Sequence, residues 1–342
     1  MYSILIMKKI ALLNDTRTQF HHGCELVVKQ IENLLMQRGV LVFATSNEGS
    51  DWSNDKKFLK DIEQCQAIVV NGEGTIHHNR PAGKKLLEVS ELAQKLNIPC
   101  FLVNTTYQSN PPEFKRYLEK FEQIYVRESQ SWLELESLGI ASTIVPDLTL
   151  SYECSFLSKR QGVGFTDSAM TPISEQLFEY CEHNKNNRFL PVLRSRKYDN
   201  KFNFVESIRD FKFDLKLSKI KLLSSDSYLE KRNLFINKTI DSYLEAVSSC
   251  NLLVSGRFHS NCFCILTETP FLALEGNSHK VQAMLKDIGL SESRLISLND
   301  IKTINFETDF GFSDIELTAL REYRQQALSK INSVFDMIVD KI

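Results

Sequence analysis

Short apolar runs alternate with amphipathic segments along most of the chain. Runs such as residues 10–13 and 67–70 are continuously apolar, which is typical of strands buried on both faces. Between them, residues 25–38 repeat apolar side chains on one helical face, and Gly39 follows where a helix would end. Buried strands that alternate with helices predict parallel sheets covered by helices on both sides.

This pattern occurs twice before a final long helix. Predicted strands of the first half span residues 10–13, 41–44, 67–70, 100–104, 123–126 and 142–145. Predicted helices there span residues 25–38, 84–96, 112–121 and 131–138. After residues 146–149 the pattern restarts, with strands at 162–165, 189–193, 219–223, 252–254 and 270–274 and helices between them. Capping boxes are expected at Ser131/Glu134 and at Ser313/Glu316.

The fold class is therefore α/β, with two doubly wound, Rossmann-like domains that face a cleft. We expect an N-terminal domain over residues 1–155, a C-terminal domain over 156–312, and a helix over 313–342 that straps the two together. A coiled-coil role for this helix is the alternative, although its heptad run is short. In doubly wound sheets a ligand binds beyond the carboxyl ends of the strands, which points to the cleft.

Composition narrows the class of protein. The 342 residues are 42% apolar and 25% charged, which is globular, and the net charge of −2 gives no case for nucleic-acid binding. The eight cysteines form no CxxC pair, so we expect reduced thiols and no metal site. The apolar start precedes Lys8 and Lys9, the reverse of a signal peptide, and is too short to cross a membrane. A cytoplasmic protein without a transmembrane segment is expected.

The loop after the first strand carries Asp15 and then a histidine pair, His21 and His22, at the start of a helix. Free backbone N–H groups and the helix dipole at such a position favour an anion. Plain capping of the helix by Asp15 or Thr16 is the alternative explanation.

The loop after the strand at 67–70 combines glycines with a carboxylate. Gly72 and Gly74 would let the backbone approach a ligand closely, and Glu73 between them is expected to be exposed. Glu73 could act as a base on a sugar hydroxyl, and His77 and His78 follow just beyond. The spacing is not a dinucleotide fingerprint, and a tight turn is the competing explanation.

The segment after the strand at 252–254 is the strongest candidate. Ser255 and Gly256 lead into Arg257, whose guanidinium suits a carboxylate or phosphate, and His259 can carry a proton near neutral pH. These residue types at a helix start could fix an anionic substrate and move a proton. A capped helix with a hydrogen-bonded histidine is the alternative.

Four more cations follow candidate strands. Arg127 ends the strand at 123–126 and is either an anion ligand or the partner of an acidic neighbour. Arg194 and Arg196 follow the strand at 189–193, and Lys280 opens a helix after the strand at 270–274. Arg194, Arg196 and Lys280 add positive charge to the second domain, whereas Arg127 belongs to the first.

Several of these stretches together resemble the polysaccharide pyruvyl transferase family. They are the Gly-rich loop at 70–74, residues 126–129 followed by 145–147, the segment 255–259, and Lys280 on a helix that ends near Gly289. They lie in the order of the family and span most of the chain. The resemblance implies a fold like that of GT-B glycosyltransferases. It also implies transfer of pyruvate from phosphoenolpyruvate to two hydroxyls of a sugar as a ketal.

With that chemistry, Arg257 would hold the donor, His259 would protonate its enol carbon, and Glu73 or a first-domain histidine would take the hydroxyl proton. Phosphoenolpyruvate is then a co-substrate, with no cofactor and no metal. The donor-binding residues are Arg257, Arg194, Arg196, Lys280, Ser255 and Gly256. The acceptor-binding residues are Asp15, His21, His22, Gly72, Gly74, His77, His78 and Arg127.

Two other functions stay open at this point. A GT-B-like glycosyltransferase would use the same basic loops for a nucleotide-activated sugar, again in surface polysaccharide (capsule or exopolysaccharide) biosynthesis. A scaffold protein would keep the fold without needing Arg257 or His259. The identity of the acceptor sugar, its attachment to a lipid, peripheral association with the inner membrane face and homo-oligomer formation are equally open.

Overall fold

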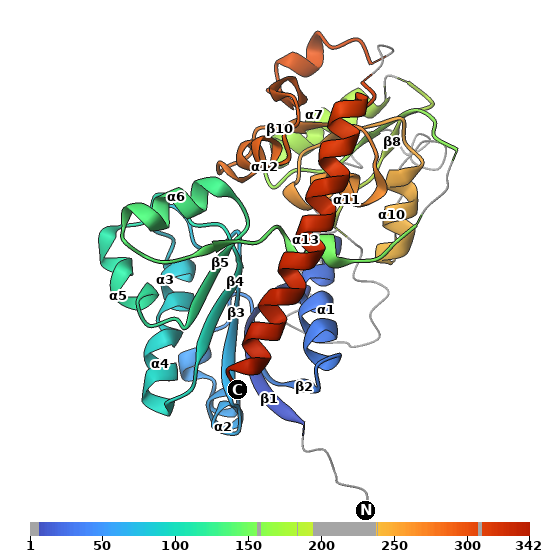
Figure 1. Ribbon diagram of the computed structural model, residues 1–342. Helices are drawn as coiled ribbons and strands as arrows, with labels where there is room; N and C mark the ends of the chain where they lie inside the picture. Colours follow the sequence, from blue (N-terminus) through green and yellow to red (C-terminus); the bar gives the residue numbers. More distant parts are fainter. Residues whose placement is uncertain (1–6, 156–158, 183, 194–236, 238, 307–309) are drawn as a thin grey trace, which may run out of the picture.

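Two parallel sheets, one in each half of the chain, form the frame of the molecule (Figure 1). The computed structural model describes residues 7–155, 159–182, 184–193, 237, 239–306 and 310–342. Within these residues both sheets are covered by helices on both faces, as the pattern of apolar runs predicted. The fold is α/β with two doubly wound domains and a C-terminal packing helix.

The first sheet has the order β2-β1-β3-β4-β5-β6, and every recorded strand pair is parallel. Chain order reverses between β1 and β3, so the loops that follow these two strands meet at a switch point, where doubly wound folds bind ligands. The strands are β1 (Lys8–Asp15), β2 (Val40–Asn47), β3 (Ala67–Glu73), β4 (Cys100–Thr105), β5 (Gln123–Val126) and β6 (Thr143–Ile144).

The second sheet repeats this arrangement, with the order β11-β10-β9-β7-β8. Its switch point lies between β7 and β9. The strands are β7 (Val163–Phe165), β8 (Arg188–Phe189), β9 (Leu252–Ser255), β10 (Phe271–Leu274) and β11 (Leu295–Ile296). The predicted strand at 219–223 lies outside the described residues.

Helices of the first half largely follow the predicted periods. They are α1 (His22–Met36), α2 (Lys56–Ile62), α3 (Pro81–Leu87), α4 (Val89–Leu96), α5 (Lys115–Leu118) and α6 (Ser129–Ser137). The capping box expected at Ser131 is wrong, because α6 starts earlier and Glu128 is its N-cap, accepting from the backbone N–H of Ser131. The predicted helix at 84–96 is divided into α3 and α4.

Helices of the second half connect its strands, and the last one is far longer than the rest. They are α7 (Thr171–Glu182), α10 (Ile240–Ser248), α11 (Phe258–Thr267), α12 (Lys280–Ile288) and α13 (Asp314–Asp340). The capping box between Ser313 and Glu316 at the start of α13 is confirmed. In the described part of the chain, none of the helices combines the length and apolarity that crossing a membrane requires.

Strand β1 shows why continuous apolar runs form the sheets. Ile10 and Leu12 face one hydrophobic core, while Ala11 and Leu13 face another on the opposite side of the sheet, and all four are fully buried. Burying each large aliphatic side chain stabilises the fold by about 1.5–3 kcal/mol. A polar side chain at any of these four positions would therefore disrupt the packing of β1 against the core on that face of the sheet.

The core on the inner faces of the two sheets is continuous. It contains Ile31 of α1, Tyr243 of α10, Phe263 of α11 and Phe335 of α13, together with side chains from both sheets. Helix α1 of the first half packs directly against α10, α11 and α13. The two halves are thus joined by a common interior rather than by a linker alone.

Helix α13 contacts both halves along its length (Figure 1). Near its start, Glu316 pairs with Arg294 at 2.7 Å. Near its end, Asp336 pairs with Arg38 at 2.7 Å, at the end of α1. Its packing face contributes Leu320, Ile331, Val334 and Phe335 to the shared core. The packing helix predicted from the apolar spacing is therefore present.

Candidate functional site

A cleft of about 260 Å³ lies where the switch-point loops of the two sheets meet. Its walls come from both halves: the end of β3, the start of α1, and the starts of α11 and α12. The predicted site residues that line it are His21, Glu73, Gly74, Arg127, Gly256, Arg257, His259 and Lys280.

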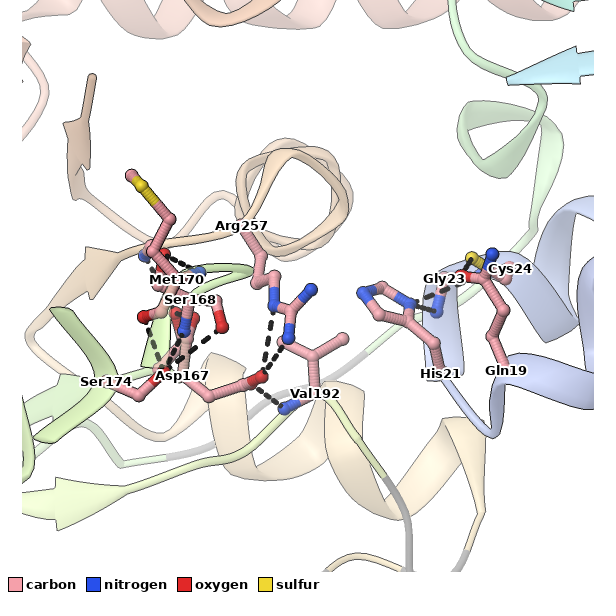
Figure 2. A network of polar contacts seen from close by, with 12 residues as sticks. Gln19, His21, Gly23, Cys24, Asp167, Ser168, Met170, Ser174, Val192 and Arg257 are labelled. Atoms are coloured by element: carbon pink, nitrogen blue, oxygen red, sulfur yellow. Dashed lines mark hydrogen bonds and ion pairs between the residues drawn. The ribbon is translucent and has the colours of Figure 1, made fainter. Parts of the chain in front are cut away.

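Arg257 is the N-cap residue of α11, and its guanidinium is held by an aspartate. Its Nε and Nη2 donate to Oδ2 of Asp167 at 3.0 and 2.5 Å, and the other carboxylate oxygen accepts from the backbone N–H of Val192 at 2.7 Å (Figure 2). Asp167 lies two residues beyond the end of β7, and the sequence pattern did not single it out. The feature of the sequence that could have identified Asp167 is its position after a strand at the switch point. The negative charge of Asp167 orients the guanidinium of Arg257 at the cleft.

Asp147 connects the other two predicted groups, Arg127 and His259. Its Oδ2 accepts from Nη1 of Arg127 at 2.9 Å and lies 3.6 Å from Nε2 of His259, and all three side chains are buried. Its Oδ1 accepts from the backbone and the hydroxyl of Thr149. Burial alone would raise the pKa of Asp147, but the charges of His259 and Arg127 outweigh it and leave that pKa well below its usual range. Asp147 is therefore a buried anion that sets the environment of His259.

The ring of His259 lies against the first turn of α1. A Cβ on Gly23 would come within 2.2 Å of its Cγ, so only glycine fits at this position. The ring of His21 meets His259 edge to face, with 5.2 Å between the ring centroids. The start of α1 and the start of α11 are thus in direct contact across the cleft.

Lys280 brings a further cation from the start of α12. Its Nζ lies 3.2 Å from the position that a Cβ of Gly74 would occupy, so this glycine leaves room for it. Arg127 packs over the face of Phe258, and Lys280 lies 5.8 Å from the same ring. Burial, and then the charge of Arg127, lowers the pKa of Lys280 to about 8.

Glu73 lies in the cleft wall, but the expectation that it is exposed is wrong. It is 5% exposed because neighbouring side chains cover it. Its Oε1 accepts from the hydroxyl of Thr16 at 2.5 Å and from the amide of Asn71 at 3.0 Å, and its Oε2 accepts from the thiol of Cys24 at 3.3 Å. The carboxylate is consequently fixed in one orientation at the edge of the cleft.

Several predicted residues do not line the cleft. Asp15 pairs with Arg17, and His22 stacks on Tyr243 in the core. His77 contacts His78 through their Nδ1 atoms, and burial and the nearby Arg80 and Lys280 lower the pKa of His77 to about 4.

Two more predicted residues have structural contacts beside the cleft. Gly72 packs against Thr105, and the hydroxyl of Ser255 donates to the carbonyl of Arg257. The remaining two, Arg194 and Arg196, lie outside the described residues.

Three side chains at the cleft could hold a metal ion. The ligand atoms of His21, Cys24 and His259 lie within 4.8 Å of one another. Burial and the adjacent Glu73 raise the pKa of the Cys24 thiol well above its ordinary value, so the thiol keeps its proton. A metal would have to displace that proton. The residue types therefore fit a metal, whereas the protonation of Cys24 opposes one.

Comparison with known proteins gives one family and one fold. A family model described as polysaccharide pyruvyl transferase matches residues 21–278. No curated protein sequence matches the chain significantly.

Among solved structures, similarity extends over nearly the whole chain at low identity. A UDP co-structure of MnaA from S. aureus has a TM-score of 0.59 at 10% identity and covers 98% of this chain and 99% of its own. Sucrose-phosphate synthase from Thermosynechococcus elongatus has a TM-score of 0.59 at 13% identity, covering 97% and 98%. UDP-GlcNAc 2-epimerase from Methanocaldococcus jannaschii has a TM-score of 0.53 at 14% identity, covering 93% and 99%. The shared feature is the GT-B-like fold.

Proposed function

Because the chain belongs to the polysaccharide pyruvyl transferase family, we propose that it transfers pyruvate from phosphoenolpyruvate to two hydroxyls of a sugar, forming a ketal. The family and the fold indicate a transferase. The donor, the ketal product, a cytoplasmic location and a saccharide acceptor from surface polysaccharide (capsule or exopolysaccharide) biosynthesis all belong to this proposal.

The observation that carries the proposal is the grouping of cations around one proton carrier. Arg127, Arg257 and Lys280 line the same cleft, and His259 lies among them. Phosphoenolpyruvate carries a carboxylate and a phosphate on adjacent positions of a small molecule, and guanidinium groups bind both in bidentate fashion. A cleft of about 260 Å³ has room for this donor together with the reacting part of a sugar.

In the proposed reaction, His259 in its protonated form donates a proton to the methylene carbon of the donor. A sugar hydroxyl attacks the neighbouring carbon and gives up its own proton to a base. The C–O bond to phosphate then breaks, and a second hydroxyl of the same sugar attacks that carbon. Two C–O bonds and one C–H bond form, while the C=C π bond and one C–O bond break. The second hydroxyl proton leaves with the phosphate, and the first passes from the base through water to His259, which restores the protonated ring.

The side chains divide these tasks. Arg257 and Lys280 would hold the anionic groups and stabilise the phosphate as it leaves. Asp147 lies 3.6 Å from Nε2 of His259, so its carboxylate would orient the ring that delivers the proton. Glu73 would accept the hydroxyl proton from its fixed position in the cleft wall.

The test is phosphate release from phosphoenolpyruvate with a panel of glycan acceptors. We expect Arg257→Ala and His259→Ala to abolish turnover while the circular dichroism spectrum stays unchanged. Arg321→Ala is the matched control, because Arg321 is an exposed arginine on α13 that pairs with Glu268 away from the cleft. Turnover that survives both cleft substitutions would refute the catalytic roles of Arg257 and His259. Absence of turnover in the wild type with every donor and acceptor would favour the scaffold function.

The alternative function, a glycosyltransferase, would be detected by measuring nucleotide release with the same panel of acceptors. The fold is shared with proteins whose structures contain UDP, which motivates this arm. Nucleotide release from a nucleotide-activated sugar, with no phosphate release from phosphoenolpyruvate, would replace the proposed donor.

A further inference from the structure

His21 is held at the junction of the two halves. It is the N-cap residue of α1, and its ring Nδ1 accepts from the backbone N–H groups of Gly23 at 3.0 Å and Cys24 at 3.3 Å. Its backbone forms a bridge with Leu193, and the N–H of the next residue donates to the carbonyl of Val192 at 3.0 Å. Both the ring and the backbone of His21 are thereby fixed.

These cap bonds determine which ring nitrogen carries the proton. A nitrogen that accepts an N–H hydrogen bond presents its lone pair to the donor and has no proton of its own. In a neutral imidazole the proton must then lie on the other nitrogen, Nε2. The start of α1 also carries the positive end of the helix dipole, which disfavours a second proton on this ring.

The surroundings of His21 keep the ring neutral. The side chain is buried, and the groups near it are His259 and Arg257 from α11 and His22 and Cys24 from α1, with Glu73 elsewhere in the same cleft wall. Burial first, and then the charges of His259 and Arg257, lower the pKa of His21 well below its ordinary value. The ring therefore does not titrate near neutral pH.

Nε2 of His21 faces the cleft. Figure 2 shows this nitrogen turned toward the guanidinium of Arg257, while Nδ1 points back to the start of α1. His21 lines the cleft beside Arg257 and His259. Among the described residues, no hydrogen bond from Nε2 to a protein acceptor is formed, so this N–H is available to a ligand.

We propose that His21 is a fixed, neutral hydrogen-bond donor whose Nε2–H binds an anionic oxygen of the donor substrate, and that it is not the base of the reaction. A capped ring has no lone pair on the nitrogen that faces the cleft, so it cannot accept the hydroxyl proton. A neutral histidine held in this way at a helix start can polarise a substrate oxygen without titrating. The identity of the anion as phosphoenolpyruvate rests on the proposed function.

The same geometry bears on a metal at His21, Cys24 and His259. Coordination through Nε2 would require the proton to move to Nδ1, and both cap bonds to Gly23 and Cys24 would be lost. His21 can therefore donate a hydrogen bond through Nε2 or bind a metal through Nε2, but not both. The two states differ in which ring nitrogen carries the proton.

The tautomer can be measured without any substrate. In the full-length protein labelled with ¹⁵N-histidine, we expect His21, assigned by its loss in His21→Asn, to show protonated Nε2 and unprotonated Nδ1 at neutral pH. A proton on Nδ1 would overturn the proposal. A shift to a metal-bound spectrum on addition of Zn²⁺ alone at equimolar concentration would overturn it in favour of the metal site.

Two substitutions separate the role of His21 as the N-cap of α1 from its role as a hydrogen-bond donor to a ligand. Asparagine is a good N-cap, so His21→Asn should keep the unfolding temperature, but its shorter side chain cannot present a donor to the cleft. We expect its affinity for phosphoenolpyruvate to fall about 10- to 100-fold, the value of one hydrogen bond to a charged group. His21→Ala should lose both the affinity and some thermal stability.

The shape of the pH profile of turnover should be the same in His21→Asn and in the wild type, because the nitrogen of His21 that faces the cleft has no lone pair to accept a proton. Loss of the acidic limb in the variant would identify His21 as the base and refute the proposal. Wild-type affinity in His21→Asn would refute it as well, since the ring would then act only as a cap.

If phosphoenolpyruvate is not the substrate, the hydrogen-bond donor role of His21 can still be tested separately. If phosphoenolpyruvate does not bind the wild type, inorganic phosphate and pyruvate serve as separate probes of the Nε2–H resonance. A downfield shift with phosphate, or with pyruvate, would support donation to a phosphate or to a carboxylate oxygen respectively. No shift with either probe would refute the donor role itself.

Discussion

Replacing Asp147 by asparagine keeps the volume of the side chain but removes the charge that faces both Arg127 and His259. Arg127 and Asp147 are each about 1% exposed, and their ionic contact is 2.9 Å long. At an effective dielectric constant of about 20, unit charges at this separation attract each other by about 6 kcal/mol, before the cost of desolvation. In the variant, Arg127 would keep its buried charge and lose the partner that compensates it.

Removal of one member of a buried ion pair typically lowers the free energy of unfolding by about 3–5 kcal/mol. With about 2–4 °C per kcal/mol for a protein domain of about 150–250 residues, Asp147→Asn should unfold roughly 6–20 °C below the wild type at pH 7. Thermal unfolding followed by circular dichroism measures this difference. Glu268→Gln is the matched control. It removes the carboxylate of the more exposed Arg321–Glu268 pair, so its change should be much smaller.

The pH dependence of this difference has a definite sign. Because the pKa of Asp147 is depressed in the folded protein, its stabilisation is present above the unfolded value of about 4 and is lost as the pH falls toward the folded value. The gap between wild type and Asp147→Asn should thus be constant from about pH 7 to 5 and shrink below about pH 4. Equal unfolding temperatures at pH 7, or a gap that does not change at low pH, would refute the reasoning.

Three further changes test other parts of the structure. Gly23→Ala places a Cβ against the ring of His259 and should lower the free energy of unfolding by about 1–3 kcal/mol in urea titration, whereas a wild-type midpoint would show that the two helix starts do not touch. The affinity for phosphoenolpyruvate should weaken as the pH rises through about 8, where Lys280 loses its proton, and calorimetry of Lys280→Gln should show weaker binding without this dependence. A wild-type affinity that stays flat across that range would contradict the role of Lys280. Ser313→Ala removes the capping box of α13 and should cost about 1 kcal/mol of stability, which an unchanged unfolding temperature would disprove.

Much of the fold could be predicted because its signals are local. Continuous apolar runs mark the buried strands, and the spacing of Leu320, Ile331 and Phe335 marks the packing face of α13. The second capping box was right because Ser313 and Glu316 both contact each other within a single turn. The first was wrong because Glu128 caps α6 instead, and periodicity cannot choose between two nearby polar residues.

The site was predicted less completely because its contacts join distant segments. Arg257 and His259 were found from their position after a strand, but Asp167 becomes relevant only once β7 and β9 pair and bring it to Arg257. His21 and His22 are neighbours in sequence, yet one ring caps α1 beside the cleft and the other stacks on Tyr243 in the core. Such differences depend on tertiary packing, which residue types alone do not specify.

The core shared by the two sheets leaves little freedom for hinge motion between them. Opening the cleft as two rigid bodies would pull α1 away from α10 and α11, and it would expose apolar side chains such as Ile31 and Phe263 to water. The bond from His22 to Val192 would break in the same movement. We expect substrates to exchange through side-chain and loop rearrangements at the mouth of the cleft, so that ligand binding changes the overall dimensions of the molecule very little in small-angle scattering.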